Sequence, residues 1–296
     1  MAREYGNAGQ GTIDRIVELE KSKRGKSRSF QQSDFIIPWN KIILSCLLGF
    51  MASWFSTPAV AWSVTGFCLV LSFLTTSRTK VEMEDESLAH LEAWIKHDFE
   101  FVKNGGSLDE TRFDDTEKMW ALGGVGEMRT SCYLVKGLPD SFTVVNDITL
   151  KKNGTTSANI DHLILHPSGV LMVDTKIWSE APYAVSSDNG SIIPKESPHW
   201  DAVSTCVYEA SFLPHTPQAI IFAVGGRGSQ RLKNQTLHIN KFYDRYTKEL
   251  REAPCPVYFV PQSEISLVVS ELSRKLDPSN MLTISDISTN PYMEIC

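Results

Sequence analysis

The segment from Asn159 to Trp178, NIDHLILHPSGVLMVDTKIW, restricts the fold more than any other part of the chain. Apolar runs on both sides of residues 166–169 (HPSG) predict two short strands joined by a tight turn. Each strand carries one acidic residue where an apolar residue is expected, Asp161 in the first and Asp174 in the second. Lys176 follows two positions after Asp174, so their side chains share a face of the strand.

The length of the turn decides whether these charged side chains meet. With a two-residue loop of Pro167 and Ser168, Asp161 lies opposite Asp174, with Cβ atoms ~5 Å apart. A four-residue loop also keeps the charged side chains on one face of the hairpin, and it places Asp161 opposite Lys176. A three-residue loop shifts the register by one residue and puts Asp161 on the other face from Asp174 and Lys176. Pro167 fits poorly in the primed turns that two-residue loops prefer, so all three lengths stay open at this point. Opposed carboxylates are destabilising unless a cation lies between them, so the shared-face registers predict a divalent metal site.

Two uncharged apolar runs, residues 42–56 and 58–76, precede this segment. The second is long enough to span a bilayer, and the first becomes so if residues 35–41 join it with Lys41 at the interface. We therefore expect a two-helix transmembrane hairpin over residues 35–77. The alternatives are a buried helical hairpin in a soluble core and a cleavable signal peptide. The signal peptide is disfavoured because a long charged region comes first and a second apolar run follows.

Basic residues predict the orientation of this hairpin. Eight Lys or Arg side chains precede the apolar runs and two follow directly, while the loop between the runs has none. Both termini are therefore expected in the cytoplasm, with the chain in a bacterial inner (cytoplasmic) membrane. The six cysteines show no CxxC or Cys/His ligand spacing, so the sequence implies neither a zinc site nor a disulfide framework.

Charge divides the chain near residue 80. Residues 1–80 carry 10 basic and 5 acidic side chains, whereas residues 81–296 carry 19 basic and 30 acidic ones. The basic part suits anionic lipid headgroups. The acidic remainder has no overall attraction for DNA, which argues against an avid, nonspecific nuclease.

The chain divides into four expected parts. These are a flexible basic tail (1–34) in which residues 12–23 can form a short helix, the transmembrane hairpin (35–77), a juxtamembrane amphipathic helix with a linker (78–118) and a main domain (119–296). Within the main domain we expect helices at 128–138, 200–213, 241–252 and 263–276, strands at 142–150, 218–224, 236–240 and 256–261, and a turn at the glycine-rich residues 123–126. This order of elements predicts an α/β sheet with helices on both faces.

Several elements together resemble one known family. GVGE (124–127) before a helix, then a strand, then IDHLIL, HPSGV and VDTKIW, resemble the nuclease-related domain (NERD) family over roughly residues 120–225. That family is assigned to the restriction-endonuclease-like superfold, whose site motif is PD-(D/E)xK. The resemblance implies that Asp161 and Asp174 bind Mg²⁺ or Mn²⁺, and that Lys176 orients or deprotonates the attacking water or stabilises charge on the phosphate. It also implies that Glu127 completes the site.

Two departures from the family pattern concern the site. Asp174 stands where the family usually has Glu, and the helix after the hairpin offers Ser204 and Thr205 where the family often has Gln. His162 is expected on the opposite strand face from Asp161 and is interpreted as structural.

Taken together, the sequence predicts a membrane-anchored, cytoplasm-facing, metal-dependent nuclease that hydrolyses phosphodiester bonds of DNA. The alternative is a catalytically silent nuclease fold that serves as a binding or scaffold module, in a membrane-associated assembly or a homo-oligomer. For the charged hairpin residues themselves, the alternative is a solvated cluster of ion pairs on a sheet face.

Overall fold

The structure is a computed structural model that describes residues 1–31, 97, 114–152, 155–187, 190–232 and 236–296. Residues 1–16 and 97–296 form one compact unit, and residues 17–96 form a second. The helices and strands are β1 (Arg3–Tyr5), α1 (Gln10–Gln31), α4 (Asp115–Gly137), β2 (Thr143–Lys152), β3 (Thr155–His166), β4 (Gly169–Ile177), β5 (Val185–Ser187), β6 (Gly190–Ile192), α5 (Trp200–Ala210), β7 (Ile220–Gly225), α6 (Gly226–Arg231), β8 (Leu237–Tyr243), β9 (Leu250–Pro261), η2 (Gln262–Glu264), α7 (Ile265–Ser273), η3 (Pro278–Asn280), α8 (Ile284–Ser288) and β10 (Met293–Ile295).

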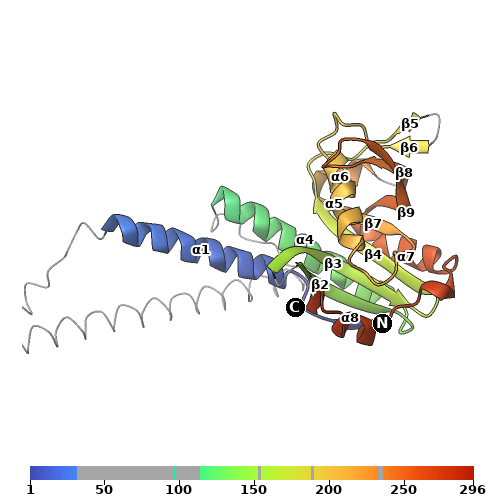
Figure 1. Cartoon of the computed structure of the whole chain (residues 1–296), viewed down its shortest axis with the longest axis horizontal. Coiled ribbons are helices and arrows are strands. Elements are labelled where there is room, and N and C mark those ends of the chain that lie inside the picture. The colour runs from blue at the N-terminus through green and yellow to red at the C-terminus, as the bar shows by residue number, and fades with distance from the viewer. Residues whose placement is uncertain (32–96, 98–113, 153–154, 188–189, 233–235) are drawn as a thin grey trace, which may run out of the picture. The chain divides into compact units, whose positions relative to one another are not determined.

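A mixed sheet of eight strands forms the centre of the larger unit (Figure 1). Its order is β1-β2-β3-β4-β7-β9-β8, and β10 also pairs with β2. Strands β2, β3 and β4 are antiparallel neighbours, whereas β4, β7 and β9 run parallel. β8 closes the far edge antiparallel to β9. Strand β4 therefore lies where the antiparallel half of the sheet meets the parallel half.

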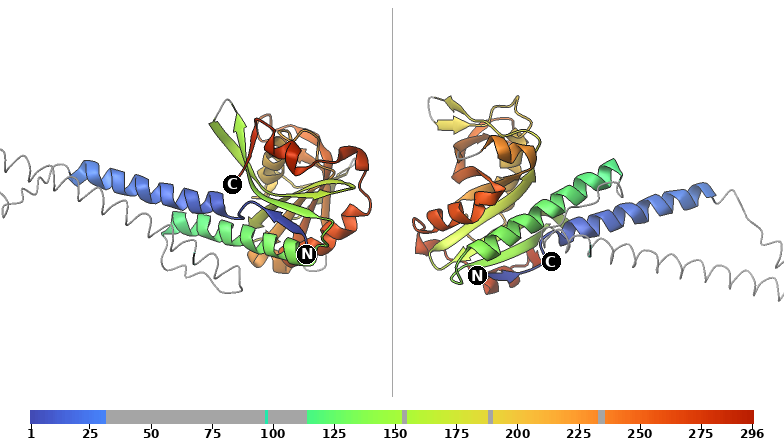
Figure 2. Two further views of the ribbon diagram at one scale, coloured as in Figure 1. Left: turned by 90° about the horizontal axis from the view of Figure 1, so that it is seen from below. Right: turned by 180° about the vertical axis from the view of Figure 1, so that it is seen from behind.

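Helices cover both faces of this sheet, as the sequence predicts (Figure 2). On one face, α4 and α7 pack against the strands through Leu134, Leu138, Ile265 and Val269, all almost fully buried. On the other face, α5 and α8 contribute Val203, Cys206 and Ile287 to a second apolar cluster that includes the stacked rings of Phe222 and Phe259. The α/β fold class is thus observed directly.

Helix α4 begins well before the expected position of residue 128. Asp114 accepts hydrogen bonds from the backbone of Thr116 and Glu117, and Glu117 accepts one from the Asp114 backbone, which forms a capping box. The glycine-rich residues 123–126 lie inside the helix, so the expected turn there is wrong. A Cβ at Gly126 would lie 2.6 Å from Cδ1 of Ile177, so this glycine allows α4 to approach β4 closely.

The expected helix at residues 241–252 is also wrong, because these residues form the hairpin between β8 and β9. Asp244 accepts hydrogen bonds from the backbone of Tyr246 and Thr247, and Lys248 adopts a positive φ of 59°. The turn therefore reverses the chain, and Tyr243 pairs with Leu250. An Asp side chain that accepts from the next backbone amides competes with helix formation, and this overrides the helical pattern of the segment.

The helix expected at residues 12–23 is present as part of the longer α1, and a short strand precedes it. β1 pairs in parallel with β2, and α1 follows after two glycines with positive φ, Gly6 and Gly9. The Asp147 carboxylate on β2 accepts a hydrogen bond from the backbone of Gly11 in the first turn of α1. An acidic side chain at a helix N-terminus is stabilising, so the sheet holds the start of this helix.

The expected transmembrane hairpin at residues 35–77 and most of the 78–118 linker lie outside the described residues. Within the described ranges, no helix combines the length and the apolar character needed to cross a bilayer.

Candidate functional site

The turn between β3 and β4 has two residues, Pro167 and Ser168. His166 pairs with Gly169, and the register continues without a shift to His162 and Val173. Gly169 has a φ of 139°, which a residue with a side chain rarely adopts, so glycine is needed where β4 begins. This register is one of the two that bring the charged side chains onto one face.

Asp161 and Asp174 follow the last pair of this ladder. The Asp161 carboxylate accepts a hydrogen bond of 2.7 Å from the backbone N–H of Thr175, across the hairpin. Nζ of Lys176 lies 3.0 Å and 2.7 Å from the two carboxylate oxygens of Asp174. The side chain of Asp174 is 4 % exposed and that of Lys176 33 %, so the ion pair lies at the margin of the core.

Burial and mutual repulsion shift the acidic groups of this cluster. Burial raises the pKa of Asp174 to about 6, although the adjacent Lys176 ammonium opposes this shift. Burial also raises the pKa of Asp161, against the effects of Lys176 and of the hydrogen bond from Thr175. Both carboxylates therefore hold their protons more tightly than exposed aspartates do.

The same contacts act on Lys176 in the opposite sense. Burial alone would lower the pKa of Lys176, but the carboxylates of Asp174 and Asp161 outweigh it and raise the pKa well above its ordinary value. Lys176 is therefore protonated at neutral pH in this arrangement. It can orient a water or stabilise negative charge on a phosphate, but it does not serve as a base.

Glu127 comes from α4 and is half-buried. Burial raises the pKa of Glu127 well above its ordinary value, and the Asp161 and Asp147 carboxylates raise it further. The structure thus brings Asp161, Asp174 and Lys176 together on the hairpin. Glu127 stands on α4, which contacts the opposite face of the hairpin at Thr175.

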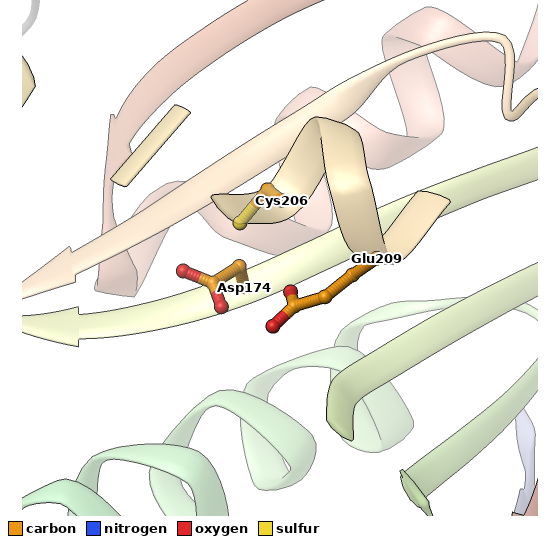
Figure 3. Close-up of side chains that lie close together, drawn as sticks. All are labelled: Asp174, Cys206 and Glu209. Atoms are coloured by element: carbon orange, nitrogen blue, oxygen red, sulfur yellow. The ribbon is translucent and has the colours of Figure 1, made fainter. Parts of the chain in front are cut away.

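Two further side chains of this cluster were missed in the sequence. Cys206 and Glu209 extend from α5 toward Asp174 on β4 (Figure 3). One ligand atom from each of these three residues lies within 4.8 Å of the other two, and all three residues are buried. The sequence signal was weak, since Cys206 and Glu209 lie three positions apart on the apolar face of a helix.

Ser204 and Thr205, which stand in the region where the family often has Gln, lie elsewhere. The Ser204 hydroxyl accepts a hydrogen bond of 2.9 Å from the backbone of Arg245, and the Thr205 hydroxyl accepts one of 3.0 Å from its guanidinium. These two residues therefore hold the β8–β9 turn against α5 rather than complete the site.

The donor set fits a divalent cation. Oε2 of Glu209 is buried and makes no hydrogen bond to the described part of the chain, whereas Oδ2 of Asp174 is paired with the Lys176 ammonium at 2.7 Å. Buried carboxylates are costly unless protonated or neutralised by a positive charge, and Lys176 supplies one such charge for several acidic groups. Asp174 and Glu209 offer the oxygen ligands that Mg²⁺ and Mn²⁺ prefer, while Cys206 adds a softer donor. Within the described residues, Asp161 and Glu127 do not join this group of converging ligand atoms.

A polar network occupies the other face of the hairpin. Nδ1 of His162 lies 2.8 Å from Oδ1 of Asn146, and Nε2 lies 3.1 Å from the hydroxyl of Thr175. Oγ1 of Thr175 lies 2.9 Å from that of Thr130, which accepts from Gln262 at 2.8 Å. His162 is fully buried, and burial lowers its pKa to about 4. His162 is therefore a neutral, structural residue, as its strand face predicts.

The segment that contains this hairpin matches the sequence model of a known family. Residues 122–204 match the sequence model of the nuclease-related domain. The matched segment contains Glu127, Asp161, Asp174 and Lys176, and it ends before Cys206 and Glu209. No curated protein and no solved structure matches the chain. The match supports a nuclease-like function that uses a divalent metal and acts on nucleic acid.

Proposed function

We propose that this protein is a membrane-anchored, cytoplasm-facing, metal-dependent nuclease that hydrolyses phosphodiester bonds of DNA. The observation that supports this most is the two-residue turn of the β3–β4 hairpin. It brings Asp161 beside Asp174 and Lys176, inside the segment that matches the nuclease-related domain. A restriction-endonuclease-like sheet, with the site at the antiparallel–parallel junction, is part of this proposal.

Each residue of the site has its own role in the proposed reaction. Asp161 and Asp174 would hold Mg²⁺ or Mn²⁺, which would polarise the phosphoryl oxygen and lower the pKa of the attacking water. Lys176 is protonated, so it stabilises the charge that develops on the phosphate and orients the water by donating hydrogen bonds. Glu127, whose pKa burial raises, would hold or accept a proton for the site.

The membrane part of the proposal is supported by the two uncharged runs within residues 35–77 and by the basic residues on either side. Anchoring at the inner membrane suits a domain whose acidic excess gives it little general attraction for DNA. Nucleic acid would then be bound by the site and its immediate surroundings rather than by the whole surface.

A cleavage assay tests the catalytic proposal. The full-length chain, purified in a mild detergent, is incubated with linear and circular DNA in Mg²⁺ or Mn²⁺. Asp161→Ala, Asp174→Ala and Lys176→Ala should each reduce metal-dependent cleavage by about 100-fold or more. The exposed residues Asp201 and Lys136 provide the matched controls Asp201→Ala and Lys136→Ala, which should cleave normally. Absence of cleavage with both metals, or equal cleavage by the site variants, would refute the proposal.

A second candidate function is a catalytically silent binding or scaffold module. It is favoured by one observation, the Asp174–Lys176 ion pair, which neutralises a proposed metal ligand internally. A silent module should show no Mg²⁺-induced or Mn²⁺-induced rise in melting temperature that Asp161→Ala removes. An active site should show such a rise, because a ligand that binds only the folded state stabilises it.

A further inference from the structure

We propose that Asp174, Cys206 and Glu209 form a thiol-containing metal subsite that binds a thiophilic divalent ion such as Zn²⁺. The subsite shares Asp174 with the proposed nuclease site. It takes two ligands from α5, beyond the residues that match the nuclease-related domain. The inference rests on the geometry of these three side chains and holds whether or not the protein cleaves DNA.

The first support is the convergence of three donors of different chemistry. Their ligand atoms lie within 4.8 Å of one another, and Figure 3 shows the side chains of α5 directed at Asp174. Ligand atoms of one tetrahedral ion with bonds of ~2.0–2.3 Å lie roughly 3.5 Å apart, so the three ligand atoms would have to approach one another by at most about 1.3 Å. Glu209 has three rotatable side-chain bonds with which to make that adjustment.

The second support is a carboxylate oxygen that lacks a partner. Glu209 is 6 % exposed, and its Oε2 has no hydrogen-bond partner within the described ranges. Asp174 is 3 % exposed, and its Oδ2 forms an ion pair of 2.7 Å with the Lys176 ammonium. Buried polar atoms are nearly always satisfied, so the unpartnered Glu209 oxygen in this group of donors points to a ligand.

The thiol decides the class of metal. Mg²⁺ takes oxygen ligands and is reluctant to lose its waters, whereas Zn²⁺ accepts thiolate and carboxylate together. Three protein ligands leave a fourth position of a tetrahedral ion open to water or to a substrate oxygen. Binding replaces the proton of the Cys206 thiol, which is released to solvent together with any proton held by Glu209.

Cadmium provides a probe that reports on the thiolate itself. Cd²⁺ is titrated into the full-length chain in detergent without Mg²⁺, and the ultraviolet charge-transfer absorption of the Cd–thiolate bond is recorded. The wild-type chain and Cys132→Ser, a control on α4, should both show the absorption that belongs to this subsite. Cys206→Ser should lose that absorption, and Glu209→Gln should weaken Cd²⁺ binding by about 10-fold or more. Thermal melting of each variant without metal shows that it is folded.

The outcomes separate this proposal from the proposed function. Equal absorption in wild type and Cys206→Ser, or unchanged affinity in Glu209→Gln, would refute the subsite and show that the buried acids are simply protonated. Mg²⁺-dependent cleavage without a Cys206-dependent absorption would leave the nuclease proposal standing and remove the subsite. A Cys206-dependent absorption in a chain that cleaves nothing would support the subsite and refute the nuclease proposal.

Discussion

Asp174 is the residue at which stability and the proposed function oppose each other. It is a buried carboxylate with one ammonium beside it and with Asp161 and Glu209 close by. Replacing a costly buried charge by a neutral group of similar shape commonly stabilises a protein while it removes function. This conflict is expected at a metal or catalytic site.

Asp174→Asn should therefore stabilise the metal-free protein at neutral pH. The folded pKa of about 6 exceeds the ordinary 3.8, so the folded state binds more protons between these values and stability falls as pH rises through them. The variant escapes this loss and should be more stable by about 1–3 kcal/mol at pH 7–8, with no such gain near pH 3.8. Denaturant unfolding in EDTA at both pH values, with Asp201→Asn as control, measures the difference. A gain of equal size at both pH values would show that the charge of Asp174 is not its cause.

The contribution of His162 to the free energy of unfolding should depend on pH in the opposite sense to that of Asp174. Its folded pKa of about 4 lies below the ordinary 6.5, so the unfolded state binds more protons and stability falls as pH drops through this window. The loss attributable to His162 is about 3 kcal/mol by pH 4. Nδ1 of His162 lies 2.8 Å from Oδ1 of Asn146 and Nε2 lies 3.1 Å from the Thr175 hydroxyl, so both ring nitrogens are engaged inside the core. Nitrogen NMR of the imidazole should show a neutral ring from pH 7 to pH 5, and an imidazolium signal at pH 5.5 would contradict this.

At the scale of elements, the sequence predicts best where one pattern dominates. The alternation around residues 166–169 predicts the β3–β4 hairpin, and the shared face of Asp161 and Asp174 follows from it. The start of α4 was missed because the three glycines at 123, 124 and 126 outweighed the Asp114–Glu117 capping box. Cys206 and Glu209 could not be predicted, since only the packing of α5 on the sheet brings them to Asp174.

Two glycines of α4 should respond in opposite ways to the same substitution. A Cβ at Gly126 would lie 2.6 Å from Ile177 and 3.1 Å from Thr175, whereas a Cβ at Gly123 meets nothing within 4 Å. Gly126→Ala should cost about 1–3 kcal/mol by overpacking and should impair the site through β4. Gly123→Ala should gain up to about 1 kcal/mol, because alanine favours a helix. Urea unfolding of both variants measures this contrast, and equal stability of the two would show that α4 does not pack on β4 this closely.

At the scale of the whole molecule, the N-terminal residues belong to the folded unit that carries the site. Residues 1–16 group with residues 97–296, through β1 on the edge of the sheet and Gly11 on Asp147. The apolar runs at 42–56 and 58–76 therefore lie in the sequence between two parts of one folded unit. The membrane hairpin that we propose there would have to return to the side of the membrane from which it came.

The membrane anchor that we propose predicts that membrane association depends on residues 35–77. The full-length protein should then sediment with membranes and stay there in high salt and alkaline carbonate, because two apolar spans would hold it by burial rather than by charge. A chain in which a short Gly/Ser linker replaces residues 35–77 should become soluble, because the first 16 residues can still complete the sheet. Release of the full-length chain by salt alone would mean that it binds the membrane surface through its basic residues. Sedimentation of the shortened chain with membranes would mean that another part of the protein forms the anchor.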